Sequence, residues 1–241
     1  MGDWREVLSG GAADLGVALD AACVERFARY LEALLDWNRR VNLTRITDPR
    51  QIAVKHFLDS LTCLRAVEFA EGARVADVGS GAGLPGLALA IARPDLRVTL
   101  IESAAKRCKF LRHAAAAIGL GGIEIAPLRA EEAGREPHYR ASFDVVASRA
   151  VGHLVVLAEY CLPLARVGGA VLAQKGRRGE AEAAEAASAL EVLGGCVEAT
   201  RRFDLPGGAG RREIVVVRKT RVTPEAYPRR PGVARKRPLR G

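Results

Sequence analysis

The sequence predicts an α/β protein built on a doubly wound, mostly parallel sheet, and three observations carry this prediction. From about residue 72 onward, short β-branched runs alternate with longer alanine-rich amphipathic stretches, as in strands that are joined by right-handed helical crossovers. Only the glycine-rich segment LPGGAG separates the last two predicted strands, so a hairpin there makes one strand antiparallel. Apolar residues before residue 67 recur at helical spacing, which adds a helical extension in front of the sheet.

Two helix starts are marked in the N-terminal part of the chain. Asp20 can cap a helix whose apolar positions, from Val24 to Leu35, follow the helical period. Asp48 precedes Pro49, which is the order of a capping residue and a proline in the first helical turn. We therefore expect a helical extension over residues 1–66, an α/β core over 67–219 and a basic C-terminal tail over 220–241 that packs on the core or on RNA.

The α/β core contains seven predicted strands and four predicted helices. The strand runs are rich in Val and Ile, whereas the helical stretches are rich in Ala and Leu. We place the strands at 74–78, 97–101, 123–126, 143–147, 169–174, 196–203 and 212–218. We place the helices at 85–92, 104–118, 151–164 and 180–193.

Composition and charge narrow the class of protein. The 241 residues are 49% hydrophobic and 27% charged, which excludes a chain that is disordered throughout. No apolar stretch is long enough for a membrane-spanning helix and no secretory leader is visible, so we expect a cytoplasmic protein without membrane contact. The net charge is +9, and nine basic residues but only one acid fall between Arg218 and Gly241. A nearly neutral body with a basic tail indicates a polyanionic partner such as nucleic acid.

The segment VADVGSGAGLPG joins the first predicted strand to the next helix. Glycines are needed where such a turn adopts positive φ or where a ligand approaches the backbone, and open α/β sheets bind ligands at this edge. The spacing Gly81-x-Gly83-x-x-Gly86 fits a dinucleotide fingerprint. The frame Asp77-x-Gly79-x-Gly81-x-Gly83 resembles the first motif of Rossmann-like S-adenosylmethionine-dependent methyltransferases and fits the predicted end of the strand better. An acid before the glycines also suits a cationic amino-acid group better than a pyrophosphate.

Further candidates follow other predicted strands at the same edge. Glu102 ends the second strand, where both kinds of cofactor place an acid that accepts hydrogen bonds from ribose hydroxyls. Ala130 and Glu131 follow the third strand and could offer an N–H group and an acceptor to adenine. Arg149 follows the fourth strand and could hold a carboxylate or phosphate. A structural ion pair is an equally good interpretation of Arg149.

Several motifs occur together and in one order along the chain. They are WNRRVNLTRIT, HFLDSL, DVGSGAGLPG, IESAAKRCKFL, RAEE, SRAV, QKG and YPRRPGVARKRPL. From Trp37 to Leu239 the sequence resembles the bacterial small-subunit ribosomal RNA methyltransferase G family (RsmG, formerly GidB). The glycine loop by itself indicates only a superfamily, whereas the segments near the two ends make the resemblance specific.

The resemblance implies a Rossmann-like class I methyltransferase that uses S-adenosylmethionine and no metal. The implied acceptor is N7 of a single guanine in the decoding-region loop of 16S rRNA, within the 30S subunit or an assembly intermediate, and we expect a monomer. Carried over position by position, the cofactor contacts are Gly79, Leu84, Glu102, Ser103, Ala104, Ala130, Glu131 and Arg149. An aromatic residue often stands in the family where this chain has Leu84, so we expect an aliphatic cover over the cofactor instead of ring stacking.

The implied methyl transfer needs few catalytic groups from the protein. Guanine N7 carries a lone pair and no proton, so we expect direct displacement without a general base. Arg149 is the expected positioning residue, and Asn42, His56 and Asp59 are weaker candidates. Three alternatives stay open: a nicotinamide-dependent oxidoreductase, a methyltransferase for protein or small molecules, and an RNA-binding module without catalysis.

Overall fold

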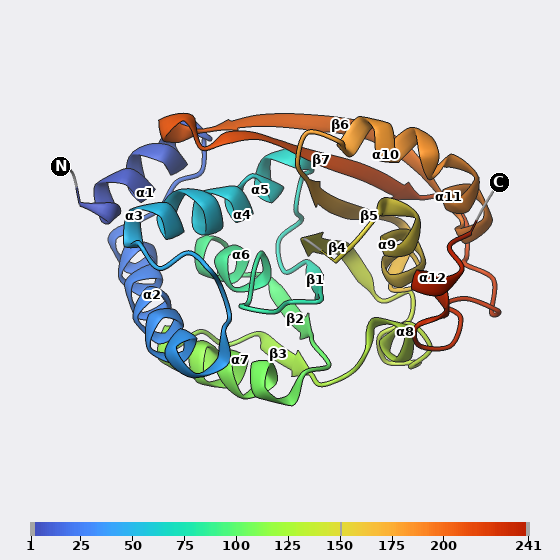
Figure 1. Ribbon diagram of the computed structural model, residues 1–241, viewed down its shortest axis with the longest axis horizontal. Coiled ribbons are helices and arrows are strands. Elements are labelled where there is room, and N and C mark those ends of the chain that lie inside the picture. The colour runs from blue at the N-terminus through green and yellow to red at the C-terminus, as the bar shows by residue number, and fades with distance from the viewer. Residues whose placement is uncertain (1–2, 150, 240–241) are drawn as a thin grey trace.

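The computed structural model describes residues 3–149 and 151–239 and shows a central sheet with helices on both faces (Figure 1). The strands are β1 (Arg74–Val78), β2 (Arg97–Ile101), β3 (Ile123–Ala126), β4 (Phe143–Arg149), β5 (Ala165–Lys175), β6 (Gly195–Leu205) and β7 (Gly210–Lys219). Their order is β3-β2-β1-β4-β5-β7-β6, and β7 runs antiparallel to both of its neighbours while the other pairs are parallel. The predicted seven-stranded sheet with one antiparallel strand is confirmed.

The N-terminal extension is helical, as the apolar spacing predicts. Its elements are α1 (Trp4–Asp14), α2 (Ala21–Val41), α3 (Pro49–Ile52), η1 (Ala53–Leu58), α4 (Asp59–Leu61) and α5 (Cys63–Ala66). Both predicted caps are confirmed, since Asp20 Oδ1 accepts from the backbone N–H of Cys23 at 2.7 Å and Asp48 Oδ1 accepts from that of Gln51 at 2.9 Å. The segment η1 is π-helical. Turns of this kind are frequent at functional sites, and the apolar period of the sequence does not reveal this one.

The remaining helices lie between and after the strands. They are α6 (Gly86–Ala92), α7 (Ala105–Ile118), α8 (Ala130–Ala133), α9 (Leu154–Cys161), α10 (Gly179–Glu185), α11 (Ala187–Leu193), the short 3₁₀ turn η2 (Pro206–Gly208) and α12 (Val233–Lys236). The helix predicted over 151–164 is shorter than expected and spans Leu154–Cys161. The strand predicted over 169–174 starts earlier, at Ala165, because Ala165 pairs with Phe143 of β4. The helix predicted over 180–193 is divided at Ala186, and no feature of the structure explains the division. None of the described helices is long and apolar enough to cross a bilayer.

Side chains alternate between the two faces of the sheet, and this divides the core in two. Val75 of β1 and Ile214 of β7 face a core that also contains buried residues of α1, α2, α6 and α7. Ala76 and Val215, their neighbours in the chain, face a second core that contains residues of α9 and α11. The N-terminal helices therefore share their apolar core with the sheet.

The C-terminal tail packs beside α8 and α9 (Figure 1). Arg229 Nη2 lies 2.6 Å from Glu159 Oε2 of α9. The backbone N–H of Gly232 donates to Glu131 Oε1 of α8 at 2.9 Å. The guanidinium of Arg140 donates to carbonyl oxygens of the tail, such as that of Tyr227 at 2.9 Å. These contacts bring α12 to the carboxyl edge of the sheet.

Candidate functional site

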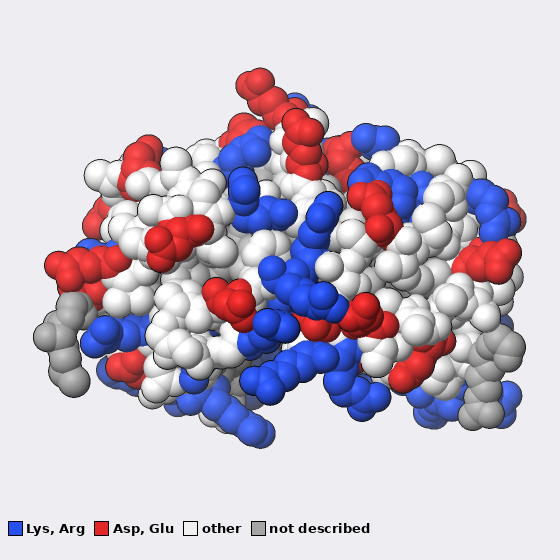
Figure 2. Space-filling view, turned by 90° about the horizontal axis from the view of Figure 1, so that it is seen from above, with Lys and Arg blue, Asp and Glu red and all other residues white. Residues whose placement is uncertain are grey.

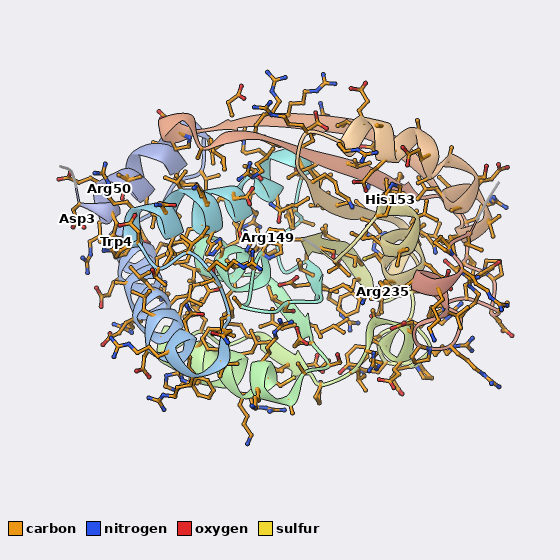
Figure 3. All side chains as sticks on the ribbon, in the orientation of Figure 1. Asp3, Trp4, Arg50, Arg149, His153 and Arg235 are labelled. Carbon is orange, nitrogen blue, oxygen red and sulfur yellow. The ribbon has the colours of Figure 1, made fainter. Side chains whose placement is uncertain are left out.

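Two adjoining hollows open at the carboxyl ends of β1, β2 and β4, and together we call them the central cleft. They enclose about 230 and 460 Å³. Both are lined by Gly79, Glu102, Ser103, Val151 and Arg235. The cleft therefore lies at the edge where open α/β sheets bind their ligands. Figure 3 shows Arg149 near the middle of the molecule and Arg235 on the side of α12.

The glycine loop between β1 and α6 brings bare backbone to the cleft. Gly79 has a φ of +72°, and a Cβ at this position would lie 2.7 Å from Val151 Cγ2. Gly81 has a φ of +55°, and its N–H donates to a carboxylate oxygen of Glu102 at 3.0 Å. Residues with a side chain are disfavoured at these positive φ values. Glycine therefore allows this loop conformation, in which a ligand in the cleft can approach the backbone.

Asp77 precedes the glycines but does not line the central cleft. Its side chain is fully buried, and Oδ2 accepts from the backbone N–H of Gly86 at 2.9 Å. Burial raises the pKa of Asp77 to about 7. The carboxyl group anchors the start of α6 through Oδ2, and a contact with a cationic ligand group, which its place in the motif suggests, stays a prediction.

Glu102 connects the glycine loop to the start of α7. Oε2 accepts from Gly81 as described, and Oε1 accepts from the backbone N–H of Ala104 at 2.8 Å. Arg107 Nη1 lies 3.6 Å from Oε2. The carboxylate is only 6% exposed, and it lines both hollows. It is therefore held in one orientation at the position where a ribose is expected.

The structure brings together nearly all of the predicted cofactor contacts. Those that line the central cleft are Gly79, Leu84, Glu102, Ser103, Ala130, Glu131 and Arg149. Ala104 acts through its backbone N–H on Glu102 instead. Glu131 has a second task, because its Oε1 accepts from Gly232 of the tail. The contacts with a cofactor themselves stay a prediction.

Arg149 and Asp59 form an ion pair across the edge of the cleft. Arg149 Nη1 lies 3.2 Å from Asp59 Oδ2 and donates to the carbonyl oxygen of Lys55 at 3.3 Å. Asp59 is paired a second time, since Arg212 Nε lies 3.3 Å from its Oδ1. Burial raises the pKa of Asp59, and the two arginines oppose that shift. The structural interpretation of Arg149 holds, and its place in the lining of the cleft also keeps the positioning role open.

The two other weak candidates have different surroundings. Asn42 is exposed and ends α2 in the left-handed conformation with a φ of 48°, which asparagine tolerates better than most residues, and it does not line the cleft. His56 does line the cleft. Its Nε2 lies 2.8 Å from Thr44 Oγ1 and its Nδ1 lies 3.0 Å from the carbonyl oxygen of Lys55. This pattern fits a neutral ring that donates from Nδ1 and accepts at Nε2.

The stability of the protein should depend on pH through His56. Burial and the charge of Arg149 lower its pKa from 6.5 to about 4. Between these values the unfolded chain binds more protons than the folded protein, so the free energy of unfolding falls as the pH is lowered through this window. One group contributes at most about 1.4 kcal/mol per pH unit. Urea unfolding at pH 7, 6 and 5 should show a shallower decline for His56→Gln than for the wild type, and equal slopes would contradict this assignment.

Sequence reasoning did not place Arg235 in the cleft. It counted this residue only as part of the basic tail, yet Arg235 lines both hollows and Gly232 lines the smaller one. The motif YPRRPGVARKRPL could have indicated Gly232 and Arg235. A basic tail that is only solvated does not need prolines and a glycine at defined positions between its arginines.

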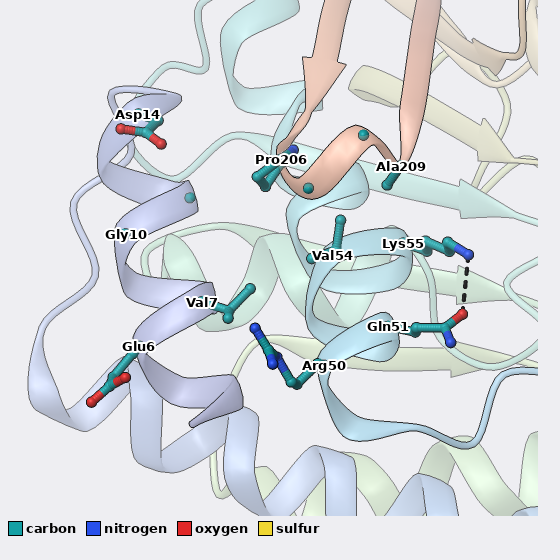
Figure 4. Close-up of a pocket in the computed structure, with 13 residues that line it drawn as sticks. Glu6, Val7, Gly10, Asp14, Arg50, Gln51, Val54, Lys55, Pro206 and Ala209 are labelled. Carbon is teal, nitrogen blue, oxygen red and sulfur yellow. Dashed lines mark hydrogen bonds between the residues drawn. The ribbon is translucent and has the colours of Figure 1, made fainter. Parts of the chain in front are cut away.

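A larger hollow of about 620 Å³ lies away from the central cleft. It is enclosed by α1, by α3 with η1, and by the loop of Pro206 to Ala209 (Figure 4). Gln51 Oε1 accepts from Lys55 Nζ at 3.0 Å within its lining. None of the predicted cofactor contacts lines this hollow, so size alone does not indicate the functional site.

Comparisons with known proteins identify the family. A family model described as rRNA small subunit methyltransferase G matches residues 23–214. The chain belongs to this family. A curated relative named ribosomal RNA small subunit methyltransferase G, from Pelotomaculum thermopropionicum, is 48% identical over 234 residues, which cover 97% of this chain and 98% of the relative. A relative of the same name from Moorella thermoacetica is 46% identical over 239 residues, which cover 99% and 100% of the two chains.

A solved structure shows the same class of fold. A SAM-dependent methyltransferase from Aquifex aeolicus superposes with a TM-score of 0.54 at 18% identity, covering 73% of this chain and 96% of that one. The chain therefore has the class I methyltransferase fold, and its membership of the family decides against the nicotinamide-dependent alternative. Among residues 3–149 and 151–239 there is no group of three or more His, Cys, Asp or Glu side chains with the arrangement of a metal site.

Proposed function

We propose that this protein transfers the methyl group of S-adenosylmethionine to N7 of one guanine in the decoding-region loop of 16S rRNA. The observation that carries the proposal is the central cleft, in which the glycine loop and Glu102 meet at the carboxyl edge of the sheet, in a chain of the methyltransferase G family. The residues present suit the methyl donor. Gly79 has no side chain, so the cofactor can approach the backbone there. Glu102 offers carboxylate oxygens to the ribose of the cofactor, and Ala130 and Glu131 line the smaller hollow of the central cleft.

The side chains around the cleft fit a reaction that needs positioning and no general base. S-adenosylmethionine supplies a methyl group that its sulfonium already activates. The N7 lone pair forms a bond to the methyl carbon as the carbon–sulfur bond breaks, and the positive charge passes to the purine, so no proton has to move. His56 is hydrogen-bonded at both ring nitrogens. Arg149 is fixed by Asp59 and by the carbonyl oxygen of Lys55. Both are suited to holding an orientation.

Positive charge on the surface supports an RNA substrate. Lys and Arg side chains gather across the middle of the face shown in Figure 2. The hairpin of β6 and β7, which lies at the top of Figure 1, carries the exposed Arg201, Arg202 and Arg211. Contacts of this kind with phosphates supply most of the affinity for RNA and weaken with salt. We propose that the enzyme acts as a monomer in the cytoplasm, on the 30S subunit or on an assembly intermediate.

The test is methyl transfer from labelled S-adenosylmethionine to 30S subunits and to 16S rRNA that lack the modification. Nucleoside analysis should find one 7-methylguanosine, and RNA mapping should place it in the decoding-region loop. A methylated base other than guanine, or transfer to protein alone, would overturn the proposal. Comparing the two RNA forms also shows which of them is the substrate.

Arg149→Ala should lower kcat/KM for RNA methylation by about 100-fold, because small misplacements of reacting groups have effects of this size. The variant also leaves the buried Asp59 with Arg212 as its remaining partner. The measurements are kcat/KM with the RNA substrate and the dissociation constant of S-adenosylmethionine by calorimetry. Arg97→Ala, an exposed arginine at the start of β2, is the matched control. Wild-type turnover together with wild-type cofactor affinity in Arg149→Ala would show that Arg149 has no positioning role.

A further inference from the structure

A third hollow lies directly beside the central cleft and shares Arg149 with it. It encloses about 420 Å³ at the ends of β4 and β5 and the start of β7, within the range of about 300–1,000 Å³ that is usual for small-molecule sites. Its lining consists of Asp59, Arg149, Gly152, Gln174, Lys175, Gly176, Glu182 and Arg212. None of the cofactor contacts predicted from the sequence lines it except Arg149.

Two buried oxygen atoms in this hollow lack a hydrogen-bond donor. Gln174 is 6% exposed, and its Nε2 donates to the carbonyl oxygen of Asp59 at 2.7 Å, which fixes the orientation of the amide. Gln174 Oε1 and Asp59 Oδ1 have no hydrogen-bond partner within the described part of the chain. Arg212 Nε lies 3.3 Å from Asp59 Oδ1 without the geometry of a hydrogen bond. Buried acceptors are almost always satisfied, so two acceptors without a hydrogen-bond donor in the lining of one hollow indicate a ligand with donors.

The other charges of the hollow are already matched. Lys175 Nζ lies 2.8 Å from Glu182 Oε2 and also donates to the carbonyl oxygen of Gly152. The carboxylate of Glu182 also accepts from the backbone N–H of Leu154 at 2.8 Å. In this lining, Gln174 Oε1 has no hydrogen-bond donor among the described residues, and Asp59 Oδ1 has only the ion pair with Arg212.

We propose that this hollow binds the acceptor guanine, whose exocyclic amino group donates to Gln174 Oε1 and whose N1–H donates to Asp59 Oδ1. This inference rests on the proposed function. Guanine is the base that presents two neighbouring donors on its Watson–Crick edge, whereas adenine, cytosine and uracil each present a donor beside an acceptor. A base must leave its stack to be read in this way. Because N7 lies on the opposite edge of the purine, recognition through N1 and the amino group leaves N7 free to react.

The proposal also gives the ion pairs around Asp59 a role in specificity. Arg149 and Arg212 hold the carboxylate from two sides, and Gln174 holds the backbone of the same residue. The two acceptors are thus fixed before the base arrives, which reduces the cost of ordering them on binding. A fixed pair of acceptors rejects a base without the matching donors, because the acceptors would stay buried and unpaired.

The experiment compares guanine with inosine, which lacks the exocyclic amino group, at the target position. A synthetic segment that carries either base is ligated into 16S rRNA and reconstituted into 30S subunits. The wild-type enzyme should methylate the inosine substrate with a kcat/KM at least about tenfold lower, as expected for the loss of one buried hydrogen bond. Gln174→Met should lower kcat/KM for guanine by a similar factor and bring the guanine-to-inosine ratio to within about threefold.

Two controls separate recognition from folding. Gln51→Met makes the same chemical change at an exposed glutamine outside this hollow, and it should keep the wild-type ratio. The affinity of Gln174→Met for S-adenosylmethionine should equal that of the wild type, because Gln174 does not line the central cleft. If Gln174→Met does not fold, the guanine-to-inosine ratio of the wild type decides by itself.

The possible failures are distinguishable. Equal methylation of guanine and inosine by the wild type would overturn this inference and leave the proposed function intact. A folded Gln174→Met variant whose ratio of kcat/KM for guanine to kcat/KM for inosine equals that of the wild type would also overturn it. Absence of methylation of either RNA by the wild type would overturn the proposed function, and this inference with it.

Discussion

Arg229→Ala is expected to lower the free energy of unfolding by about 3–5 kcal/mol, the usual cost of removing one partner from a buried ion pair. Glu159 is 1% exposed, and its two oxygens accept from Arg229 Nε at 2.9 Å and Nη2 at 2.6 Å. The backbone N–H of Arg229 donates to the same carboxylate at 2.8 Å. Without the guanidinium, a carboxylate stays buried in α9 without a counter-charge. Urea unfolding at pH 7.5 measures the difference.

The same substitution should weaken cofactor binding, because Arg229 holds the segment that carries Gly232 and Arg235 into the central cleft. We expect calorimetry to show a higher dissociation constant for S-adenosylmethionine. Arg230→Ala changes the exposed neighbour and should leave both measurements near wild type. The double variant Glu159→Gln with Arg229→Met removes the uncompensated charge, so it should recover stability but not cofactor affinity. A loss below 1 kcal/mol in Arg229→Ala would show that this ion pair does not anchor the tail.

Glu102→Ala is expected to raise the dissociation constant of S-adenosylmethionine by at least about 100-fold. The expectation combines two losses, each in the range of about 1.5–3 kcal/mol for hydrogen bonds to a charged group. The carboxylate is expected to accept from the ribose hydroxyls, and it also holds the glycine loop through the N–H of Gly81 and the start of α7 through that of Ala104. Calorimetric titration measures the affinity, and thermal unfolding measures the loss of loop anchoring.

Two further variants sharpen this test. Glu102→Gln keeps one acceptor oxygen and should raise the dissociation constant by about tenfold, less than alanine does. Glu124→Ala removes an acid from the neighbouring strand β3, where it bonds to Thr99 and Tyr139, and it does not line the central cleft. Its cofactor affinity should equal that of the wild type. A dissociation constant within threefold of wild type in Glu102→Ala would remove Glu102 from the cofactor site.

Local sequence predicted most of the fold because the local signals agree with the tertiary structure. The strands β1, β2 and β3 begin and end where their β-branched runs do. Asp20 and Asp48 cap the helices that follow them, since a cap depends only on the next few residues. The start of the fifth strand was predicted too late because a distant partner extends the strand. Ala165 belongs to β5 because it pairs with Phe143 of β4. The residues next to Ala165 in the sequence do not predict that pairing.

The candidate site divides in the same way. The glycine loop and Glu102 were predictable, because each follows a strand directly and parallel strands bring their carboxyl ends to one edge. The roles of Asp77 and Arg149 were not settled by sequence. Asp77 faces the start of α6, and the partner of Arg149 is 90 residues away.

The sequence by itself determined the succession of strands and helices along the chain, the two helix caps and the glycine loop at the edge of the sheet. Through its motifs it also indicated the family. Only the tertiary structure decided how the chain closes around the site: Arg229 meets Glu159 over 70 residues, Gln174 meets Asp59 over 115, and Arg235 returns from the tail to the central cleft. The physical reason is that caps, turns and periodicity depend on neighbours in the chain. Buried ion pairs and free acceptors depend instead on which surfaces the packing of the two cores brings together.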